Sequence, residues 1–249
     1  MAEKREHKIV SASSGEARKS GAKTSQTVQH NVRPAPAKGN AGGLRFGAVL
    51  LWLLAIGFEV LALLVLFGKV SFTFMPVLYQ LIAFIVLDLI CVVIGSLLWK
   101  KANRIDPASE RNRTKFWLWN NMGLIVAIFA FVPLVVLLLT NKDLDKRTKI
   151  ICTIAAVIAL LIGGAASIDY DPVSQEQLDN AMVVFGDTEV YWAPFGKVYH
   201  IDENCQALAR SETLTVGTVD EAIAAGRTRL CAFCASNHNV TEVATDDAA

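Results

Sequence analysis

The chain has 249 residues, of which 53% are hydrophobic and 19% are charged, and its formal net charge is +1. This composition is too apolar for an ordinary soluble domain and too charged in places for a chain embedded in lipid along its whole length. The near-zero net charge hides an asymmetry, because the first 47 residues are basic and those after residue 168 are acidic. The two ends are therefore expected to meet different surroundings.

Residues 1–43 are predicted to form a disordered basic tail. They are rich in Lys, Ser, Ala, Gly and Gln and hold few large apolar side chains, so they bury too little surface to offset the entropy of ordering. The segment lacks the early apolar core of a secretory signal peptide. Solvation of the terminus is the simplest role for it, and contact with anionic lipid headgroups is the alternative.

Four apolar stretches follow, at residues 48–67, 74–99, 116–140 and 150–168. Each is near the roughly 20 residues that cross a bilayer core as a helix, and none shows the polar stripe of a helix in a soluble protein. Trp52 and Trp99 lie toward span ends, where their rings favour the headgroup layer. Residues 44–168 are therefore predicted to be a four-helix transmembrane bundle, which makes the lipid bilayer of a cell membrane its first partner.

The placement of Lys and Arg predicts the orientation of the spans. The tail and the loop at residues 100–115 are basic, whereas the first inter-span loop offers only Lys69. The third loop is mixed, because its four basic residues are partly offset by Asp143 and Asp145. Since cytoplasmic loops carry the excess of Lys and Arg, both termini are expected in the cytoplasm. In that reducing compartment cysteines favour metal binding over disulfides.

Two acidic residues, Glu59 and Asp88, lie near the middles of the first two predicted spans. Acids inside a membrane are costly and usually face the bundle interior or a water-filled cavity. One hypothesis is a proton or cation site, as in a small transporter or channel component. The alternative is a protonated acid that hydrogen-bonds a neighbouring helix through Gln80, Asn120 or Asn121.

Small residues recur at four-residue intervals in the fourth span: Ala155, Ala159, Gly163 and Ser167. Such a row allows two helix backbones to approach closely. It predicts packing either against another helix of the same chain or against a protein partner or second copy. Cys91 and Cys152 lie in apolar runs and are expected to be small buried side chains.

After the spans, residues 169–180 are predicted to be a linker, residues 181–237 a small α+β domain, and residues 238–249 a disordered acidic tail. Residues 182–185, 189–192 and 197–200 have the composition of strands, and a Pro/Gly turn joins the last two into a hairpin. Thr218 and Glu221 have the spacing of a helix capping box, and Gly226 is placed to end that helix.

Four residues of this domain have the spacing of a metal site, H-x4-C…C-x2-C: His200, Cys205, Cys231 and Cys234. Tetrahedral Zn²⁺ takes four such N/S donors, and a domain with a thin core is often stabilised by a structural ion. The sequence therefore predicts a zinc-stabilised cytoplasmic interaction or sensing domain on a multi-pass membrane protein. A redox-sensing dithiol at Cys231 and Cys234 is an alternative. His238 is expected to be a solvated tail residue, with substitution for one of the four ligands as the alternative.

Residues 189–235 resemble a small bacterial module that is similar to the metal-binding domain of the Ada DNA-repair protein. The matching segments are 198–200 with 205–208, 218–222 with Gly226, and 231–234. The resemblance covers none of the membrane part and implies a zinc site and its fold. In Ada-type domains the first ligand is a cysteine that accepts a methyl group from DNA, whereas His200 stands there in this chain.

An imidazole cannot replace that thiolate nucleophile, and an acidic domain surface repels DNA phosphates. Nucleic acid is therefore not an expected partner. The sequence also has no Walker, GxGxxG, HExxH or GxSxG motif, so we expect no catalytic activity.

Overall fold

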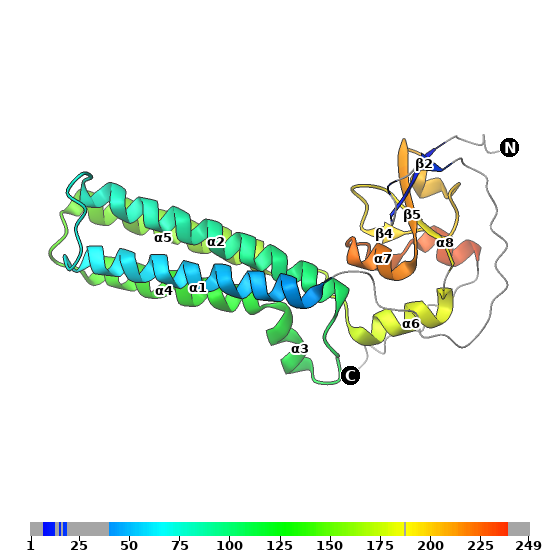
Figure 1. Cartoon of the computed structure of the whole chain (residues 1–249), viewed down its shortest axis with the longest axis horizontal. Coiled ribbons are helices and arrows are strands. Elements are labelled where there is room, and N and C mark those ends of the chain that lie inside the picture. The colour runs from blue at the N-terminus through cyan, green and yellow to red at the C-terminus, as the bar shows by residue number, and fades with distance from the viewer. Residues whose placement is uncertain (1–6, 13–14, 16, 19–39, 187, 239–249) are drawn as a thin grey trace. The chain divides into compact units, whose positions relative to one another are not determined.

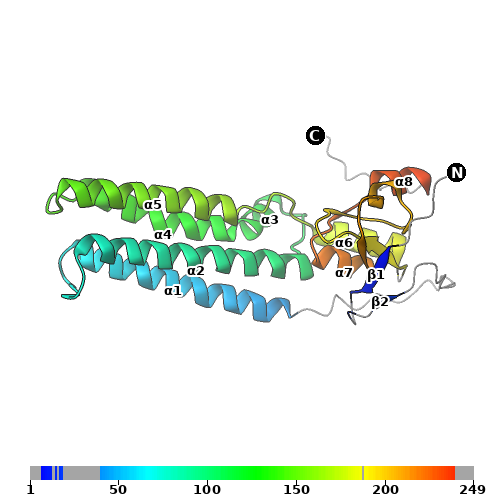
Figure 2. The same cartoon turned by 90° about the horizontal axis from the view of Figure 1, so that it is seen from above.

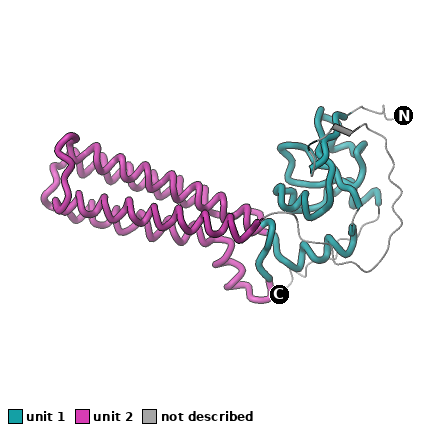
Figure 3. The backbone as a smooth tube through the Cα atoms, in the orientation of Figure 1, with its two compact units in different colours: residues 1–39, 104–109, 173–249 teal, residues 40–103, 110–172 magenta. Residues whose placement is uncertain are grey.

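The computed structural model describes residues 7–12, 15, 17–18, 40–186 and 188–238. These residues belong to two compact units, coloured separately in Figure 3. The membrane unit consists of Asn40–Asn103 and Glu110–Pro172. The terminal unit combines the described parts of Met1–Gly39 and Val173–Ala249 with the short segment Arg104–Ser109.

Four long apolar helices run side by side in the membrane unit (Figures 1 and 2). By length and composition each is able to cross a membrane: α1 (Ala41–Leu66), α2 (Val77–Ile105), α4 (Met122–Thr140) and α5 (Lys146–Ser167). Together with the small α+β region at the C-terminal end, this architecture confirms the predicted fold class.

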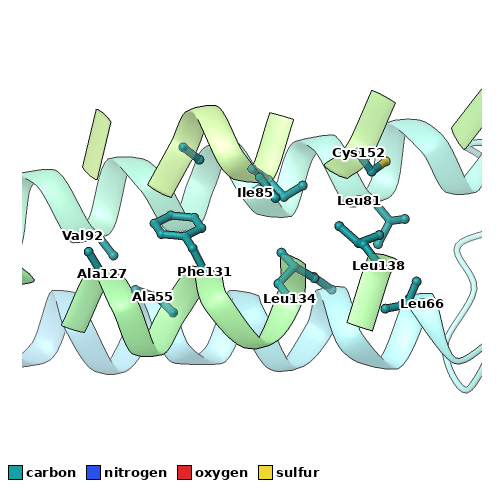
Figure 4. Packing of buried hydrophobic residues seen from close by; sticks show 14 of the residues in the cluster. Ala55, Leu66, Leu81, Ile85, Val92, Ala127, Phe131, Leu134, Leu138 and Cys152 are labelled. Carbon is teal, nitrogen blue, oxygen red and sulfur yellow. The ribbon is translucent and has the colours of Figure 1, made fainter. Parts of the chain in front are cut away.

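Buried apolar side chains, among them Phe131 and Leu134, pack along the middle of α4 (Figure 4). Large side chains on the outside are also apolar: Phe129 is 70% exposed and Leu161 is 66% exposed. A surface of this kind is costly in water and favourable against lipid chains. The packing therefore agrees with the assignment of these helices as membrane spans.

The row of small residues on α5 is used inside the bundle. Ala159, Gly163 and Ser167 are all buried within the chain, and the hydroxyl of Ser167 donates to that of Ser96 on α2 at 2.8 Å. A side chain at Gly163 would meet Phe131 at 3.4 Å. The small residues of this row thus allow close approach between α5 and neighbouring helices of the same chain. The prediction of self-association through this row is not supported.

The third predicted span begins later than the sequence indicates. The apolar stretch at residues 116–140 is split into α3 (Arg113–Asn120) and α4, with a break at Asn121. The side-chain amides of Asn120 and Asn121 donate to the carbonyls of Phe116 at 3.1 Å and Trp117 at 3.0 Å. Asparagine competes in this way for backbone carbonyls and favours helix ends. The span therefore starts at Met122.

The described part of the terminal unit is a small α+β assembly. One sheet has the strand order β2-β1-β5-β3, and β4 and β6 form a second, parallel pair. The elements are β1 (Lys8–Ser11), β2 (Ala17–Arg18), α6 (Gln175–Phe185), β3 (Val190–Trp192), β4 (Val198–Tyr199), η1 (Gln206–Leu208), β5 (Thr213–Gly217), α7 (Val219–Ala224), β6 (Arg229–Leu230) and α8 (Ala232–Asn237). The side chains of Val190, Leu214 and Val219 are fully buried in its core.

The structure differs from the predicted disordered tail at Lys8–Ser11, which form β1. This strand pairs in parallel with β5, and Ile9, opposite Leu214, is 3% exposed. The amide of Ala12 donates to the carbonyl of Val216 at 2.8 Å. One buried aliphatic side chain and a free strand edge thus order a segment whose composition indicates disorder. Most of the predicted tail, residues 1–6, 13–14, 16 and 19–39, and residues 239–249 lie outside the described residues.

A helix replaces the end of the predicted linker at residues 169–180 and the predicted strand at residues 182–185. It is α6, and it begins with a reciprocal capping box between Ser174 and Gln177. It ends at Gly186, whose φ of 54° suits a residue without a Cβ atom. The cap fixes the start of the helix. The β-branched Val183 and Val184 adopt the helical conformation because they continue a helix that has already started.

The terminal unit combines three separate stretches of chain: one before α1, one that runs from the last two residues of α2 into the loop before α3, and one after α5.

Candidate metal centre

His200 is positioned by a short hairpin. Its backbone exchanges two hydrogen bonds with Tyr191, each 2.7 Å long, so the predicted turn at residues 193–196 does bring the two segments together. Arg227 holds this turn by donating to the carbonyl of Ala193 at 2.8 Å and also to that of Pro194. The imidazole itself is 3% exposed. The paired backbone of Tyr191 and His200 thus fixes the position of the buried imidazole ring.

Cys205 follows at the start of the short helix η1. Its amide donates to the carbonyl of Asp202 at 3.2 Å, which closes the polar turn after His200. Its carbonyl accepts from Leu208, a fully buried core residue, at 2.8 Å. The turn and the core contact bring the Cys205 sulfur back toward the end of β4.

Cys231 and Cys234 lie at the start of α8, immediately after β6. The amide of Cys231 donates to the carbonyl of Tyr199 at 2.9 Å, which continues the parallel pairing of β4 with β6. Because Tyr199 directly precedes His200, this pairing places the second half of the site beside the first. One turn of helix then carries Cys234 to the same face as Cys231.

The four predicted ligands converge. Their donor atoms all lie within 4.8 Å of one another, and all four side chains are buried. Nδ1 of His200 is 3.7 Å from Sγ of Cys234. Zn–N and Zn–S bonds of about 2.0 and 2.3 Å at tetrahedral angles put such a nitrogen and sulfur about 3.5 Å apart. The cluster therefore has the donor set and the size of a tetrahedral site for a thiophilic metal ion.

The electrostatics of the cluster favour a positive ion at its centre. Burial lowers the pKa of the His200 imidazole, so the neutral, metal-binding form is favoured. Burial raises the pKa of the Cys205 thiol to about 12, the backbone N–H of Ala207 opposes this shift, and Cys234 and Cys231 add to it. A divalent cation among the thiols supplies the charge that would make their thiolate forms stable there.

No family model, curated protein or solved structure matches the chain. The resemblance of residues 189–235 to Ada-type domains is thus carried by the ligand spacing and the local motifs alone. What the geometry itself supports is a buried Cys₃His cluster able to hold a metal ion.

The remaining candidate residues lie apart from this cluster. His238 is exposed at the end of α8 and does not belong to the group of four. Glu59 and Asp88 are both buried in the membrane unit and interact electrostatically with each other. The sequence therefore pointed to two separate sets of polar residues, and the structure assembles each of them.

Two positioning residues escaped the sequence analysis. Tyr191 fixes the backbone of His200, and Arg227 fixes the turn between them. The alternation in the segments at residues 189–192 and 197–200 is the signal that indicates a paired tyrosine opposite the histidine. No local pattern marks Arg227, because the two turn carbonyls that accept its hydrogen bonds, those of Ala193 and Pro194, lie more than 30 residues earlier in the chain.

Proposed function

We propose that the terminal unit binds one Zn²⁺ through His200, Cys205, Cys231 and Cys234, and that the ion stabilises an interaction or sensing domain of a multi-pass membrane protein. The observation that carries the proposal is the convergence of four buried N and S donors from two distant segments. Zinc is favoured because three thiolates and one imidazole are a common structural ligand set for it. The Ada-type resemblance implies the same ligand order.

A structural role is favoured over a catalytic one. Catalytic zinc sites keep one coordination position for water or substrate, whereas four protein donors fill a tetrahedral site. Each ligand side chain is at most 6% exposed, which leaves little access for a substrate. The proposal therefore includes no reaction at the metal.

Metal binding is also favoured over a redox dithiol at Cys231 and Cys234. Reactive cysteines are partly exposed and have a lowered pKa, because the thiolate is the reacting form. Here both thiols are buried, and the neighbouring Cys205 has a raised pKa. A third thiol and an imidazole beside the pair are explained by a metal site and have no role in a simple dithiol switch.

The cytoplasm is the proposed location of the terminal unit. The segment Arg104–Ser109, which belongs to this unit, is part of the basic loop at residues 100–115. Basic loops stay on the cytoplasmic side during insertion. The described N-terminal and C-terminal segments belong to the same unit as Arg104–Ser109. Assigning this unit to the cytoplasm therefore assigns all three segments to it. Labelling of single cysteines added at the two ends and in the first inter-span loop, in intact cells, tests this orientation.

The metal site is tested by measuring zinc in the purified full-length protein. We expect one zinc per chain in the wild type and a large loss in Cys231→Ser and His200→Ala. The full chain is needed because β1, far from the ligands in sequence, completes the sheet.

Two matched controls separate ligand loss from a general effect of substitution. Cys152→Ser changes an equally buried cysteine in α5, and His238→Ala changes the neighbouring exposed histidine. Both should keep zinc at the wild-type level. A wild-type protein purified without chelators that contains no zinc and cannot be loaded with it would refute the proposal.

A further inference from the structure

The membrane unit contains a second constellation that the zinc proposal does not use. Glu59 on α1 is 7% exposed and Asp88 on α2 is 1% exposed. Phe58, next to Glu59, and Phe84, one turn before Asp88, have their rings 6.4 Å apart, so α1 and α2 pack together in this region. The acids therefore lie on adjacent helices, within about one helical turn of each other in depth.

This level is well inside the predicted membrane core. Asp88 lies eleven residues after the start of α2 at Val77, which is about 16 Å of helix. Glu59 lies seven residues before the end of α1 at Leu66, or about 10 Å. The hydrocarbon core of a bilayer is about 30 Å thick, so both acids lie within the apolar length of helix that would cross it.

Within the described part of the chain, neither carboxylate oxygen of Asp88 has a hydrogen-bond partner. The amides that the sequence suggested as partners are used elsewhere. Gln80 donates to the loop carbonyl of Phe72 at 2.9 Å, and Asn120 and Asn121 donate within their own helix end. Hydrogen bonding to these amides therefore does not account for Asp88, and a buried carboxyl group without a partner calls for an explanation.

No cationic side chain is available at this depth. Lys and Arg are absent from residues 46–68, 77–99, 122–140 and 150–168. The other titratable groups in the bundle core are the thiols of Cys91, one turn from Asp88, and Cys152. From α4 and α5 the core contributes mainly small and apolar side chains, among them Ala127, Phe131 and Ala156. The positive charge that balances the acids must therefore come from outside the spans.

We propose that Glu59 and Asp88 form an intramembrane proton-binding site, with Asp88 as the deeper acceptor. Two neighbouring carboxylates cannot both stay charged in a low-dielectric core, and one proton turns a carboxylate into a carboxylic acid that can donate to its partner. A metal ion is the weaker alternative, because Na⁺-like or Mg²⁺-like ions need several further oxygen ligands. Apolar side chains of the bundle core such as Ala127 and Phe131 offer none.

The proposal is tested with the full-length protein in lipid vesicles and the hydrophobic reagent dicyclohexylcarbodiimide. A protonated carboxyl group adds across one C=N bond of this reagent and ends as a stable N-acylurea, which peptide mass spectrometry locates. We expect adducts on Glu59 or Asp88 at neutral pH that decline as the pH is raised. Asp143→Asn, which changes an exposed loop acid, should leave this labelling unchanged.

The single variants test whether the two acids act as a pair. In Asp88→Asn the remaining Glu59 has no charged neighbour, so its labelling should decline at a lower pH than in the wild type. Glu59→Gln should have the same effect on Asp88. Asp88→Glu keeps a carboxyl group and should keep labelling, and unchanged hydrogen–deuterium exchange of α4 and α5 in each variant checks that the bundle still folds.

Three outcomes would overturn the proposal. The first is a wild-type protein that shows no adduct on either acid at any pH. The second is an Asp88→Asn variant in which Glu59 is labelled with the wild-type pH profile. The third is labelling that Na⁺, K⁺ or Mg²⁺ suppresses at constant pH, which would mark the pair as a metal-cation site.

Discussion

Replacing Cys231 by serine should open the terminal unit locally, and the structure gives the size of the effect. In the proposed zinc site, an ion bound by both Cys205 and Cys231 would close a loop of 26 residues. Treated as a cross-link, closure of such a loop is worth about 3.5 kcal/mol of chain entropy. This is a lower bound, because apparent zinc-binding energies of small domains reach about 10–16 kcal/mol at neutral pH.

A loss of about 3.5 kcal/mol corresponds to a roughly 300-fold increase in the open population. Hydrogen–deuterium exchange followed by peptide mass spectrometry should detect it as much faster exchange in peptides covering β4, η1 and β6. This local readout is preferable to a single melting temperature, since the chain contains two compact units. Peptides from α2 and α5 should exchange as in the wild type.

Cys152→Ser is the matched control, because this cysteine is also fully buried but lies in α5. It should leave exchange of β4 and β6 unchanged. The reasoning fails if Cys231→Ser exchanges at the wild-type rate in these peptides while its zinc is gone, since the metal would then not hold the two halves together.

Three further substitutions test other parts of the structure. Phe131→Ala should cost about 3–5 kcal/mol in the thermal or denaturant unfolding of the bundle, whereas the lipid-facing Phe129→Ala should cost much less. Ile9→Ala should cost about 2 kcal/mol and speed amide exchange in β5 without loss of zinc; unchanged exchange would show that β1 is not paired. Hydrogen bonds from Thr148 lower the pKa of Asp145 from its ordinary 3.8, so the stability this cap gives α5 is present above that pH and is lost as the pH falls through the lowered value. The first turn of α5 should therefore exchange faster in strong acid, and Asp145→Ala should show that exchange already at neutral pH.

The spans and the metal ligands were predictable because their signals are local. About 20 apolar residues mark a span whatever surrounds it. The spacing of His200 with Cys205, and of Cys231 with Cys234, is fixed by the reach of one short turn each. Hydropathy placed the start of the third span too early, because the aromatic residues of α3 count as apolar. The competing backbone bonds of Asn120 and Asn121 end that helix.

The rest depended on contacts between distant segments. Composition indicates disorder for the residues around Ile9, and only the free edge of β5 orders them. Val183 and Val184 favour strands locally, but the cap at Ser174 starts a helix that includes them. The sequence also could not show that Glu59 and Asp88 interact electrostatically, because that depends on how α1 packs against α2. Local propensity is a weak guide wherever tertiary contacts decide.

The parallel pairing of β1 with β5 sets an order of events during biosynthesis. Lys8 leaves the ribosome roughly 200 residues before its partner Thr213. At typical translation rates of about 5–20 residues per second, β1 must wait about 10–40 s for its neighbour. All four predicted spans are synthesised in that interval, so β1 can pair with β5 only after the last of them has been made. Pairing of β1 with β5 is thus a late event in the synthesis of the chain, and until then this edge of β5 stays open.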